Sequence, residues 1–389
     1  MKIVDIETLS CRAGWRDWTF LKISTDEGIV GYSSCTDFHG STPGVIATVR
    51  HLSDFLIGQD PRCVEKIYWD LYRITRQSSG GIVQKSIGAI ENALLDIKAR
   101  ALNIPVYELL GGPLREEIRL YWSHCGTTRV RSHEYINREP VLSLDGIGAL
   151  GKEVIESGYL GLKTNIILFE DKPRVLRQGF VGGYGSTDRK ASKKIVRGVE
   201  KLLGTFRDSV GPDLDIILDV NMHFRIDGNL SIAQAAQPFN LTWLELDPDD
   251  PKSLSLFKQK ATMPIASGEK QLTIRGYRPF FEAHAMDIAI LDVSWNGILQ
   301  SKKIADLAET YEMNVAPHNH GSPLATIMTA HFCAAVSNLV MMEYDVDDVP
   351  WRDDIVSKPP VIKSGHLQLP TGPGWGADLN EEVIKAHTL

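Results

Sequence analysis

The stretch that decides the fold lies at residues 216–225, where the chain reads IILDVNMHFR. A short apolar run ends there on Asp219, and Asn221 follows two positions later. Both side chains cost free energy to bury without partners. We therefore expect a buried strand that ends at Asp219 beside other polar groups.

The same pattern recurs through the rest of the chain, where short apolar runs alternate with helical stretches and each run ends on a polar residue. The spacings between these polar residues are 23 to 26: Asp219, Glu245, Glu269, Asp292, His318 and Glu343. One strand, one helix and two short loops need about 20–30 residues. The spacing therefore predicts strand–helix units that close into an α/β fold, a (β/α)8-type TIM barrel, with these residues at its mouth.

Lys163 ends the apolar run GYLGL one strand before Asp219. The interval between the two residues is about twice the repeat, and it contains the glycine-rich stretch GFVGGYGSTDRK at 179–190. We interpret this stretch as a long insertion over the mouth rather than as a missing strand. The sequence leaves open whether it forms a lid.

The N-terminal part of the chain has a different texture. The run FLKISTDEGIVGYSS at 20–34 has two β-rich segments around a turn, which predicts a hairpin. Apolar residues at helical spacing predict a helix over 86–102, and the Gly-Gly pair at 111–112 marks a stop. Strands followed by helices indicate an α+β domain.

The chain has 389 residues, more than the roughly 250–300 at which a single core stops growing. Two domains or one large barrel with additions is therefore expected. The last stretch is rich in Gly and Pro and is predicted to return to the first domain. The predicted parts are the α+β domain at 1–115, the barrel at 116–360 and the returning segment at 361–389.

Composition argues against several classes of partner. A net charge of −7 and a pI near 5.9 disfavour nucleic acid and anionic membranes, which bind basic surfaces. There is no apolar run of about 18 residues and no apolar segment at the start, so we expect a cytoplasmic protein with no membrane partner. Five cysteines without a CxxC spacing are predicted to be ordinary buried thiols: Cys11, Cys35, Cys63, Cys125 and Cys333.

Three carboxylates lie on consecutive predicted strand ends, at Asp219, Glu245 and Glu269. Three anions held close together either raise one another's pKa values or bind a cation. A set of hard oxygen ligands with room for water and substrate oxygens suits Mg²⁺. We therefore predict a Mg²⁺ site there, against the alternative of solvated carboxylates at the rim.

The next two strand ends carry Asp292 and His318. A carboxylate bonded to an imidazole fixes its tautomer and stabilises the imidazolium, which suits a general base that later acts as an acid. His320 lies two residues further on and remains an alternative. Lys163 is expected to offset the charge of a substrate carboxylate, and Glu343 to donate a proton to an enolate oxygen, unless the two form only a structural ion pair.

Together these residues resemble the mandelate racemase subgroup of the enolase superfamily over nearly the whole chain. In the N-terminal domain the helix AIENALLDIKARALNIPVYELLGG is similar to the family's capping-domain signature. The barrel motifs follow in the family's order: DVN at 219–221, WLE at 243–245, SGE at 267–269, DVSWNG at 292–297, APHNHG at 316–321 and ME at 342–343.

The resemblance implies removal of a proton α to a substrate carboxylate, with an enediolate intermediate. It makes Asp219, Glu245 and Glu269 the Mg²⁺ ligands, His318 with Asp292 the base, and Glu343 the donor to the carboxylate. It also implies a capping domain that selects the substrate, and a homo-oligomer.

One departure from the family pattern bears on the reaction. The family's second strand often carries Lys-x-Lys, whose second lysine is a base on the opposite face of the substrate; here LKTN places Asn165 at that position. With His318 as the single obvious base, we predict elimination of a β-hydroxyl from a sugar acid, an aldonate or aldarate. The same imidazolium would protonate the departing hydroxyl.

Two alternatives stay open. A racemase, an epimerase or a lactone cycloisomerase would share the enediolate, and gains weight if His223, Tyr121 or Lys163 reaches the opposite face. A non-catalytic barrel that binds a carboxylate ligand is the alternative from another class. The substrate-binding candidates are Trp15, which could cover a sugar face, Arg16, which could pair with a distal carboxylate, and Asn165, Asn221 and His320.

Overall fold

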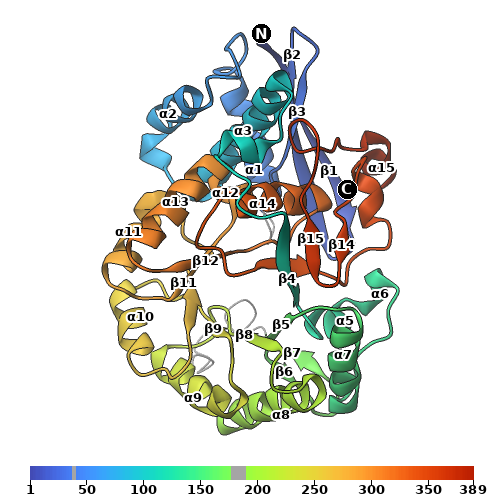
Figure 1. Ribbon diagram of the computed structural model, residues 1–389, viewed down its shortest axis with the longest axis vertical. Helices are drawn as coiled ribbons and strands as arrows, with labels where there is room; N and C mark the ends of the chain where they lie inside the picture. The colour runs from blue at the N-terminus through green and yellow to red at the C-terminus, as the bar shows by residue number, and fades with distance from the viewer. Residues whose placement is uncertain (37–40, 177–189) are drawn as a thin grey trace.

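A barrel of eight parallel strands forms the centre of the computed structural model, which describes residues 1–36, 41–176 and 190–389 (Figure 1). Each strand pairs with its predecessor up to β12, and β13 pairs with β4. A bridge between Val315 of β12 and Leu339, just before β13, completes the ring. The predicted TIM barrel is confirmed. Its strands are β4 (Glu117–Ser123), β5 (Gly161–Asn165), β8 (Asp215–Asp219), β9 (Trp243–Glu245), β10 (Ile265–Ser267), β11 (Ile288–Leu291), β12 (Asn314–Pro317) and β13 (Met342–Asp345).

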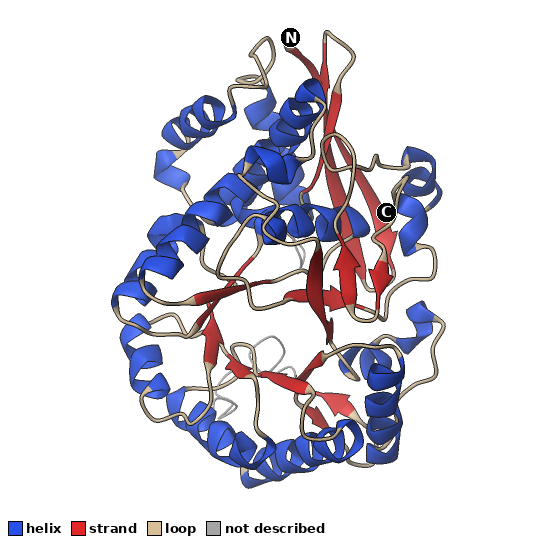
Figure 2. Ribbon diagram, in the orientation of Figure 1, coloured by secondary structure: helices blue, strands red, loops and turns tan. Residues whose placement is uncertain are grey.

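Helices between the strands cover the outside of the barrel (Figure 2). In α8, the Ser192 side chain accepts the N–H of Ile195 at the start, and Gly211 with a φ of 77° ends the helix. The main covering helices are α7 (Leu144–Glu156), α8 (Lys193–Val210), α9 (Ile226–Ala236), α10 (Pro251–Lys258), α11 (Thr273–Glu282), α13 (Ile298–Thr310) and α14 (Pro323–Ala334). Shorter ones are α5 (Thr127–Arg131), α6 (His133–Ile136) and α12 (Val293–Asn296).

The N-terminal domain is an antiparallel sheet with helices packed beside it (Figure 1). The predicted hairpin is formed by β2 and β3, and its turn places Gly28 at a φ of 79°, where a side chain would be strained. The predicted helix is α3, which begins five residues earlier than expected. The elements are β1 (Ile3–Ala13), β2 (Arg16–Thr25), β3 (Val30–Ser34), α1 (Thr42–Ser53), α2 (Val64–Ile74), α3 (Gly81–Leu102) and α4 (Val106–Leu109).

The C-terminal residues first extend the barrel sheet and then contact the N-terminal domain. The hairpin of β14 (Ile362–Lys363) and β15 (His366–Gln368) pairs with the start of β4. Further on, the Trp375 indole donates to the carbonyl of Tyr32, and α15 (Glu381–Ala386) packs near β1. The domain boundaries at 115 and 360 stay predictions.

Helix α3 is fastened to the barrel segment that follows β11. A side chain on Gly88 would meet the backbone oxygen of Trp295 at 2.6 Å, so the helix and this segment touch backbone to backbone. Asn92 donates to the carbonyl of Val293 at 2.9 Å and accepts the N–H of Ile298 at 2.8 Å. The capping helix therefore fixes the loop that begins at Asp292.

The long interval after β5 does not hide a barrel strand among the described residues, because β5 pairs directly with β8. Part of the interval is the short hairpin of β6 (Ile167–Leu168) and β7 (Arg174–Val175). Most of the predicted insertion, residues 179–189, lies outside the described residues, and its suggested role as a lid stays a prediction.

Four of the five cysteines are buried, as predicted, and Cys63 is exposed. Cys63 is exposed because it lies at the surface, directly before α2. No helix in the described ranges has the length and apolar character that a membrane crossing requires.

Candidate active site

The predicted site residues lie at the carboxyl ends of the barrel strands. Asp219 and Glu245 are the last residues of β8 and β9 and are register partners in the sheet. Glu269 follows β10 after a turn at Gly268, and Asp292 and His318 directly follow β11 and β12. Because all these strands run parallel, the side chains share one end of the barrel.

Two strands extend further than the sequence suggested. Lys163 lies in the middle of β5, and the strand continues to Asn165. Glu343 is the second residue of β13, which continues to Asp345. Residues two apart on a strand face the same side, so Asn165 accompanies Lys163 and Asp345 accompanies Glu343 at the mouth.

Lys163 is buried between two carboxylates. Its Nζ lies 3.2 Å from Oε1 of Glu245 and 2.6 Å from Oε1 of Glu343. Burial alone would lower the pKa of Lys163, but Glu245 and Glu343 raise it well above its ordinary value. Lys163 is therefore an ammonium group with a fixed position.

Glu343 accepts hydrogen bonds in this arrangement, and its expected role as a proton donor stays a prediction. Its oxygens contact the hydroxyl of Ser123 and accept the N–H of Asn319 at 2.8 Å, in addition to the pair with Lys163. Burial would raise the pKa of Glu343, but Lys163 and His318 lower it to about 2. The contacts with Lys163 and His318 therefore favour the carboxylate form of Glu343.

Asp219, Glu245 and Glu269 together carry more negative charge than the described side chains around them neutralise. Burial and the charge of Glu245 raise the pKa of Asp219 well above its ordinary value. Desolvation in the mouth also raises the pKa of Glu269 to about 7, against the opposing effect of His318. Lys163 supplies one positive charge to this group, at Glu245.

This donor set fits the predicted Mg²⁺. Carboxylates that repel one another in a desolvated site gain from a divalent cation, and hard oxygen ligands suit magnesium. Asp219, Glu245 and Glu269 would hold it. Their ligand atoms are not gathered into a coordination sphere: in the parts of the chain that are described, three ligand atoms within 4.8 Å of one another occur instead at His124, His320 and Asp345.

The predicted base and its partner are in contact. Nδ1 of His318 lies 2.8 Å from Oδ2 of Asp292, and Nε2 lies 3.6 Å from Oε1 of Glu269. The other oxygen of Asp292 accepts the backbone N–H groups of Ser294 and Trp295, which begin α12. Asp292 is thereby held in place while it orients the imidazole.

The ring of His318 also packs against Trp295, with ring centroids 5.2 Å apart. Burial alone would lower the pKa of His318, but Glu269 and Asp292 raise it to about 10. The surrounding anions therefore favour the imidazolium, the form that the base adopts after it has taken a proton.

Arg16 is buried in an ion pair with a carboxylate of the chain itself. Its Nη2 lies 2.7 Å from Oδ2 of Asp348 and 3.9 Å from Oδ2 of Asp345. Nε and Nη1 of Arg16 and Nε1 of Trp15 are buried without a hydrogen-bond partner. The Arg16 guanidinium lies 4.5 Å from the Trp15 ring centre. Roles of both residues in binding substrate stay proposals.

The two predicted asparagines both contact Asp219. Asn165 donates through its side-chain amide to Oδ2 of Asp219 at 3.1 Å and accepts from the Thr127 hydroxyl. The backbone N–H of Asn221 donates to Oδ1 of Asp219 at 2.7 Å, with a φ of 53°. Asn165 and Asn221 therefore position the carboxylate of Asp219 in the predicted metal site. A direct contact of either asparagine with the substrate stays a proposal.

Three buried or half-buried residues of the mouth were not identified from the sequence: His124, Asp247 and Asp345. Asp247 accepts from the hydroxyl of Ser267 and the N–H of Gly268. The two aspartates lie two residues beyond Glu245 and Glu343, which were identified from the sequence, whereas His124 directly follows β4, a strand that was not identified from the sequence. Strand alternation applied past the first polar residue would have found the two aspartates.

Two family models match the chain. Residues 153–383 match the enolase C-terminal domain-like family, and residues 13–111 match the N-terminal domain of mandelate racemase and muconate lactonizing enzyme. The chain belongs to the enolase superfamily. The mandelate racemase subgroup inferred from the motifs is confirmed by the pair of domains, and the capping domain and barrel are those of this superfamily.

Relatives within the enolase superfamily include sugar-acid dehydratases. The D-xylonate dehydratase of Haloferax volcanii is 28% identical over 400 aligned residues, which cover 100% of this chain and 89% of that one. The D-galactonate dehydratase of Pectobacterium atrosepticum is 29% identical over 379 residues, which cover 94% of this chain and 90% of that one.

A solved structure from Burkholderia xenovorans strain LB400 superposes with a TM-score of 0.97 and 41% identity, covering 100% of this chain and 98% of that one. That protein is given as a candidate L-alanine-DL-glutamate epimerase. A second structure of it contains magnesium and fumarate.

Proposed function

We propose that the protein is a Mg²⁺-dependent dehydratase of a sugar acid, which removes the proton α to the carboxylate and eliminates a β-hydroxyl. Two features of the barrel mouth carry the proposal. One is a single imidazole base, His318, which is held by Asp292. The other is the ammonium group of Lys163, which two carboxylates fix in position. The predicted lyase class agrees with the dehydratases among the relatives.

Asp219, Glu245 and Glu269 would hold Mg²⁺, which when bound supplies a Lewis acid for the substrate carboxylate and stabilises developing negative charge. Magnesium together with fumarate in the Burkholderia relative supports a carboxylate ligand beside such an ion. Lys163 adds a fixed positive charge at the same place, and Glu343 holds its ammonium through the 2.6 Å contact.

His318 takes the α-proton at Nε2, because Nδ1 is engaged by Asp292. The α-proton of a carboxylate is very weakly acidic, so the chain must stabilise the negative charge that develops on the carboxylate oxygens. Lys163 supplies that charge stabilisation within the protein. The imidazolium formed on His318 is stabilised by the anions around it, which lowers the energy of the state after proton transfer.

An epimerase or racemase is the second candidate, favoured by the Burkholderia relative. It requires a second base that reaches the opposite face of the substrate carbon. Lys163 lies on β5, two strands from β13 and on the other side of the mouth from β12. Its ammonium is fixed between the carboxylates of Glu245 and Glu343. That position suits charge stabilisation rather than removal of a second proton, which favours elimination.

The test is a screen of aldonic, uronic and aldaric acids with Mg²⁺ in D₂O, in which 2-keto acid and α-deuterium are measured together. We expect a 2-keto-3-deoxy acid from one or a few compounds. His318→Asn should lower kcat by at least about 100-fold and leave Mg²⁺ binding unchanged. Deuterium exchange or inverted configuration without keto acid would establish the epimerase instead, and an active His318→Asn variant would disprove the base.

A sugar acid is accordingly the proposed partner. We also propose a homo-oligomer and a cytoplasmic location. Light scattering of the purified protein tests the first, and fractionation of the cells that make it tests the second.

A further inference from the structure

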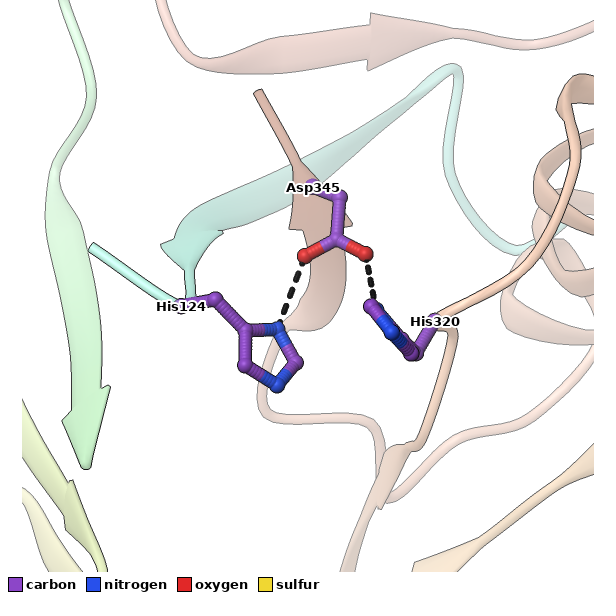
Figure 3. A group of neighbouring side chains, drawn as sticks. All are labelled: His124, His320 and Asp345. Carbon is purple, nitrogen blue, oxygen red and sulfur yellow. Dashed lines mark hydrogen bonds and ion pairs between the residues drawn. The ribbon is translucent and has the colours of Figure 1, made fainter. Parts of the chain in front are cut away.

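A second group of two imidazoles and a carboxylate lies at the mouth and consists of His124, His320 and Asp345 (Figure 3). His124 follows β4, and its Nδ1 lies 2.9 Å from Oδ1 of Asp345. His320 contacts the other oxygen of Asp345 through its own Nδ1. The rings of His124 and His320 are 4.5 Å apart between centroids. The group is assembled from three neighbouring strand ends, those of β12, β13 and β4.

Hydrogen bonds connect this group to the proposed catalytic residues. The hydroxyl of Ser123 lies 3.0 Å from Nδ1 of His124 and contacts Oε1 of Glu343, the atom that also binds Lys163. His124 is therefore two hydrogen-bonded groups away from the proposed ammonium of the active site.

One member of this group, His320, also borders the cavity beside the proposed base, His318. His320 and His318 line one hollow at the barrel mouth. His124 lies beside His320, with the two ring planes tilted by 47°. A substrate bound with its α-carbon at His318 and its next carbons toward His320 would bring its β-hydroxyl near this pair of rings.

The arrangement is that of a carboxylate orienting two imidazoles rather than of an open metal site. Both oxygens of Asp345 are already engaged by ring nitrogens. The guanidinium of Arg16 lies 3.9 Å from one of these oxygens, and Arg352 binds the backbone oxygen of Asp345. These two guanidinium groups oppose a divalent metal ion there, and Asp345 has no oxygen left to bind one.

The two imidazoles differ in what they can offer a ligand. Burial lowers the pKa of His320 to about 3, so this ring stays neutral. The His124 side chain is 17% exposed, and its hydrogen bonds with described residues are made at Nδ1. The Nε2 edge of His124 is left for a ligand, with the Asp345 carboxylate behind the ring to stabilise a positive charge on it.

We propose that His124 is the general acid that protonates the departing β-hydroxyl, and that Asp345 positions its imidazole. This proposal rests on the dehydratase function proposed above. It gives to a second histidine the acid role that the sequence placed on His318. His318 then keeps only the role of base.

The step balances as follows. The bond between the α-carbon and its hydrogen breaks, the proton goes to Nε2 of His318, and the electron pair enters the enediolate. The enediolate then forms a double bond between the α- and β-carbons while the β-carbon–oxygen bond breaks, and the oxygen takes the Nε2 proton of His124 and leaves as water. The resulting enol becomes the keto acid by protonation at the β-carbon, and both imidazoles exchange protons with solvent. No oxidant or reductant is needed.

The test compares leaving groups. The probes are D-galactonate, or the sugar acid found in the screen, and its 3-deoxy-3-fluoro analogue, since fluoride departs as a stable anion without needing a proton. For His124→Gln we expect kcat for loss of water to fall at least about 100-fold, while fluoride release and α-deuterium exchange stay within about threefold of wild type. Asp345→Asn should give the same selective loss to a smaller extent.

His51→Gln is the matched control, because His51 is exposed on α1, far in sequence from the barrel. Equal loss of both leaving groups in His124→Gln, with folding intact by circular dichroism, would overturn the proposal in favour of a structural role. Unchanged loss of water would also overturn it, because His318 would then act as base and acid. Stoichiometric Zn²⁺ bound to the wild type and lost in the variant would overturn it in favour of a metal site. A wild type that forms no keto acid but exchanges α-deuterium would instead disprove the dehydratase itself.

Discussion

His318 and His320 lie two residues apart, yet the protein shifts their pKa values in opposite directions. Burial lowers both, but the anions of Glu269 and Asp292 raise the pKa of His318 to about 10. His320 faces one carboxylate, Asp345, together with the positive charge of Arg16, and its pKa falls to about 3. The two histidines of one loop are thereby prepared for different states of charge.

The same electrostatics predict how metal binding depends on pH. Burial raises the pKa of Asp219 well above its ordinary value and that of Glu269 to about 7, so protons compete with Mg²⁺ for these carboxylates. A metal displaces protons from its ligands. We therefore expect Mg²⁺ affinity to rise roughly tenfold between pH 6 and pH 8, with release of protons. Calorimetry in two buffers of different ionisation enthalpy measures both quantities.

Glu269→Gln is the companion variant for this measurement. It removes the carboxyl group whose pKa lies near 7, so its weaker Mg²⁺ binding should depend less on pH over the same range. Wild-type affinity that stays constant from pH 6 to pH 8, without proton release, would contradict the expectation.

At the scale of the element, the register of the strands explains what the sequence could predict of the site. Polar residues at spacings of 23 to 26 identified the six strand ends from Asp219 to Glu343 without any knowledge of contacts. The length of each strand could not be predicted in this way. An apolar run shows which residues of a strand are buried, but it does not show at which residue the hydrogen bonding to the neighbouring strand ends. For that reason Asp345, which extends β13, was missed. His124 was missed because the strand that precedes it, β4, was not identified from the sequence.

Helix α3 provides a prediction at this scale. In Gly88→Ala the new methyl group would meet the backbone of Trp295, at 2.6 Å from its oxygen, and neither backbone can yield without moving. We expect a loss of about 1–3 kcal/mol in the free energy of unfolding and lower kcat, because the segment that begins at Asp292 must shift. Urea denaturation and steady-state kinetics measure the two effects.

Gly148→Ala is the matched control, on α7, where the added methyl would make only an ordinary contact 3.8 Å from Thr205. Its helical position should make it neutral or stabilising by up to about 1 kcal/mol. If both variants behaved alike, the close contact between α3 and the barrel would not be the cause.

At the scale of the whole molecule, contacts between distant parts of the chain lay beyond sequence reasoning. Arg16 was proposed from the sequence as a partner for a distal carboxylate of the substrate, and the structure pairs it with Asp348, 332 residues away. No local pattern contains such a partner. The overall architecture could be predicted from the sequence, because a barrel repeats one local strand–helix unit. The interface between the capping domain and the barrel occurs once and has no such repeat to reveal it.

Asp96 connects three of these distant parts. Its carboxylate accepts from the backbone N–H of Tyr32, the backbone N–H of Trp375 and the guanidinium of Arg100, each at 2.9 Å. Asp96→Ala leaves these buried donors without an acceptor, so we expect a loss of about 2–4 kcal/mol in the free energy of unfolding. Limited proteolysis should cut the C-terminal segment of the variant first.

Asp70→Ala on α2 is the control, because Asp70 makes exposed ion pairs with Lys66 and Arg73, and such pairs contribute little. A segment beyond 361 that resists protease equally in wild type and in Asp96→Ala would show that Asp96 does not hold it.

The bonds from α3 to the segment after β11 also limit how such proteins can be recombined. Asn92 and Glu91 hold the backbone from Val293 to Leu299, next to the partner of the base. A chimera that took the capping domain from one relative and the barrel from another would separate these matched surfaces. New specificities built by exchange of whole domains should therefore work only when α3 and the segment at 292–300 are inherited from the same parent.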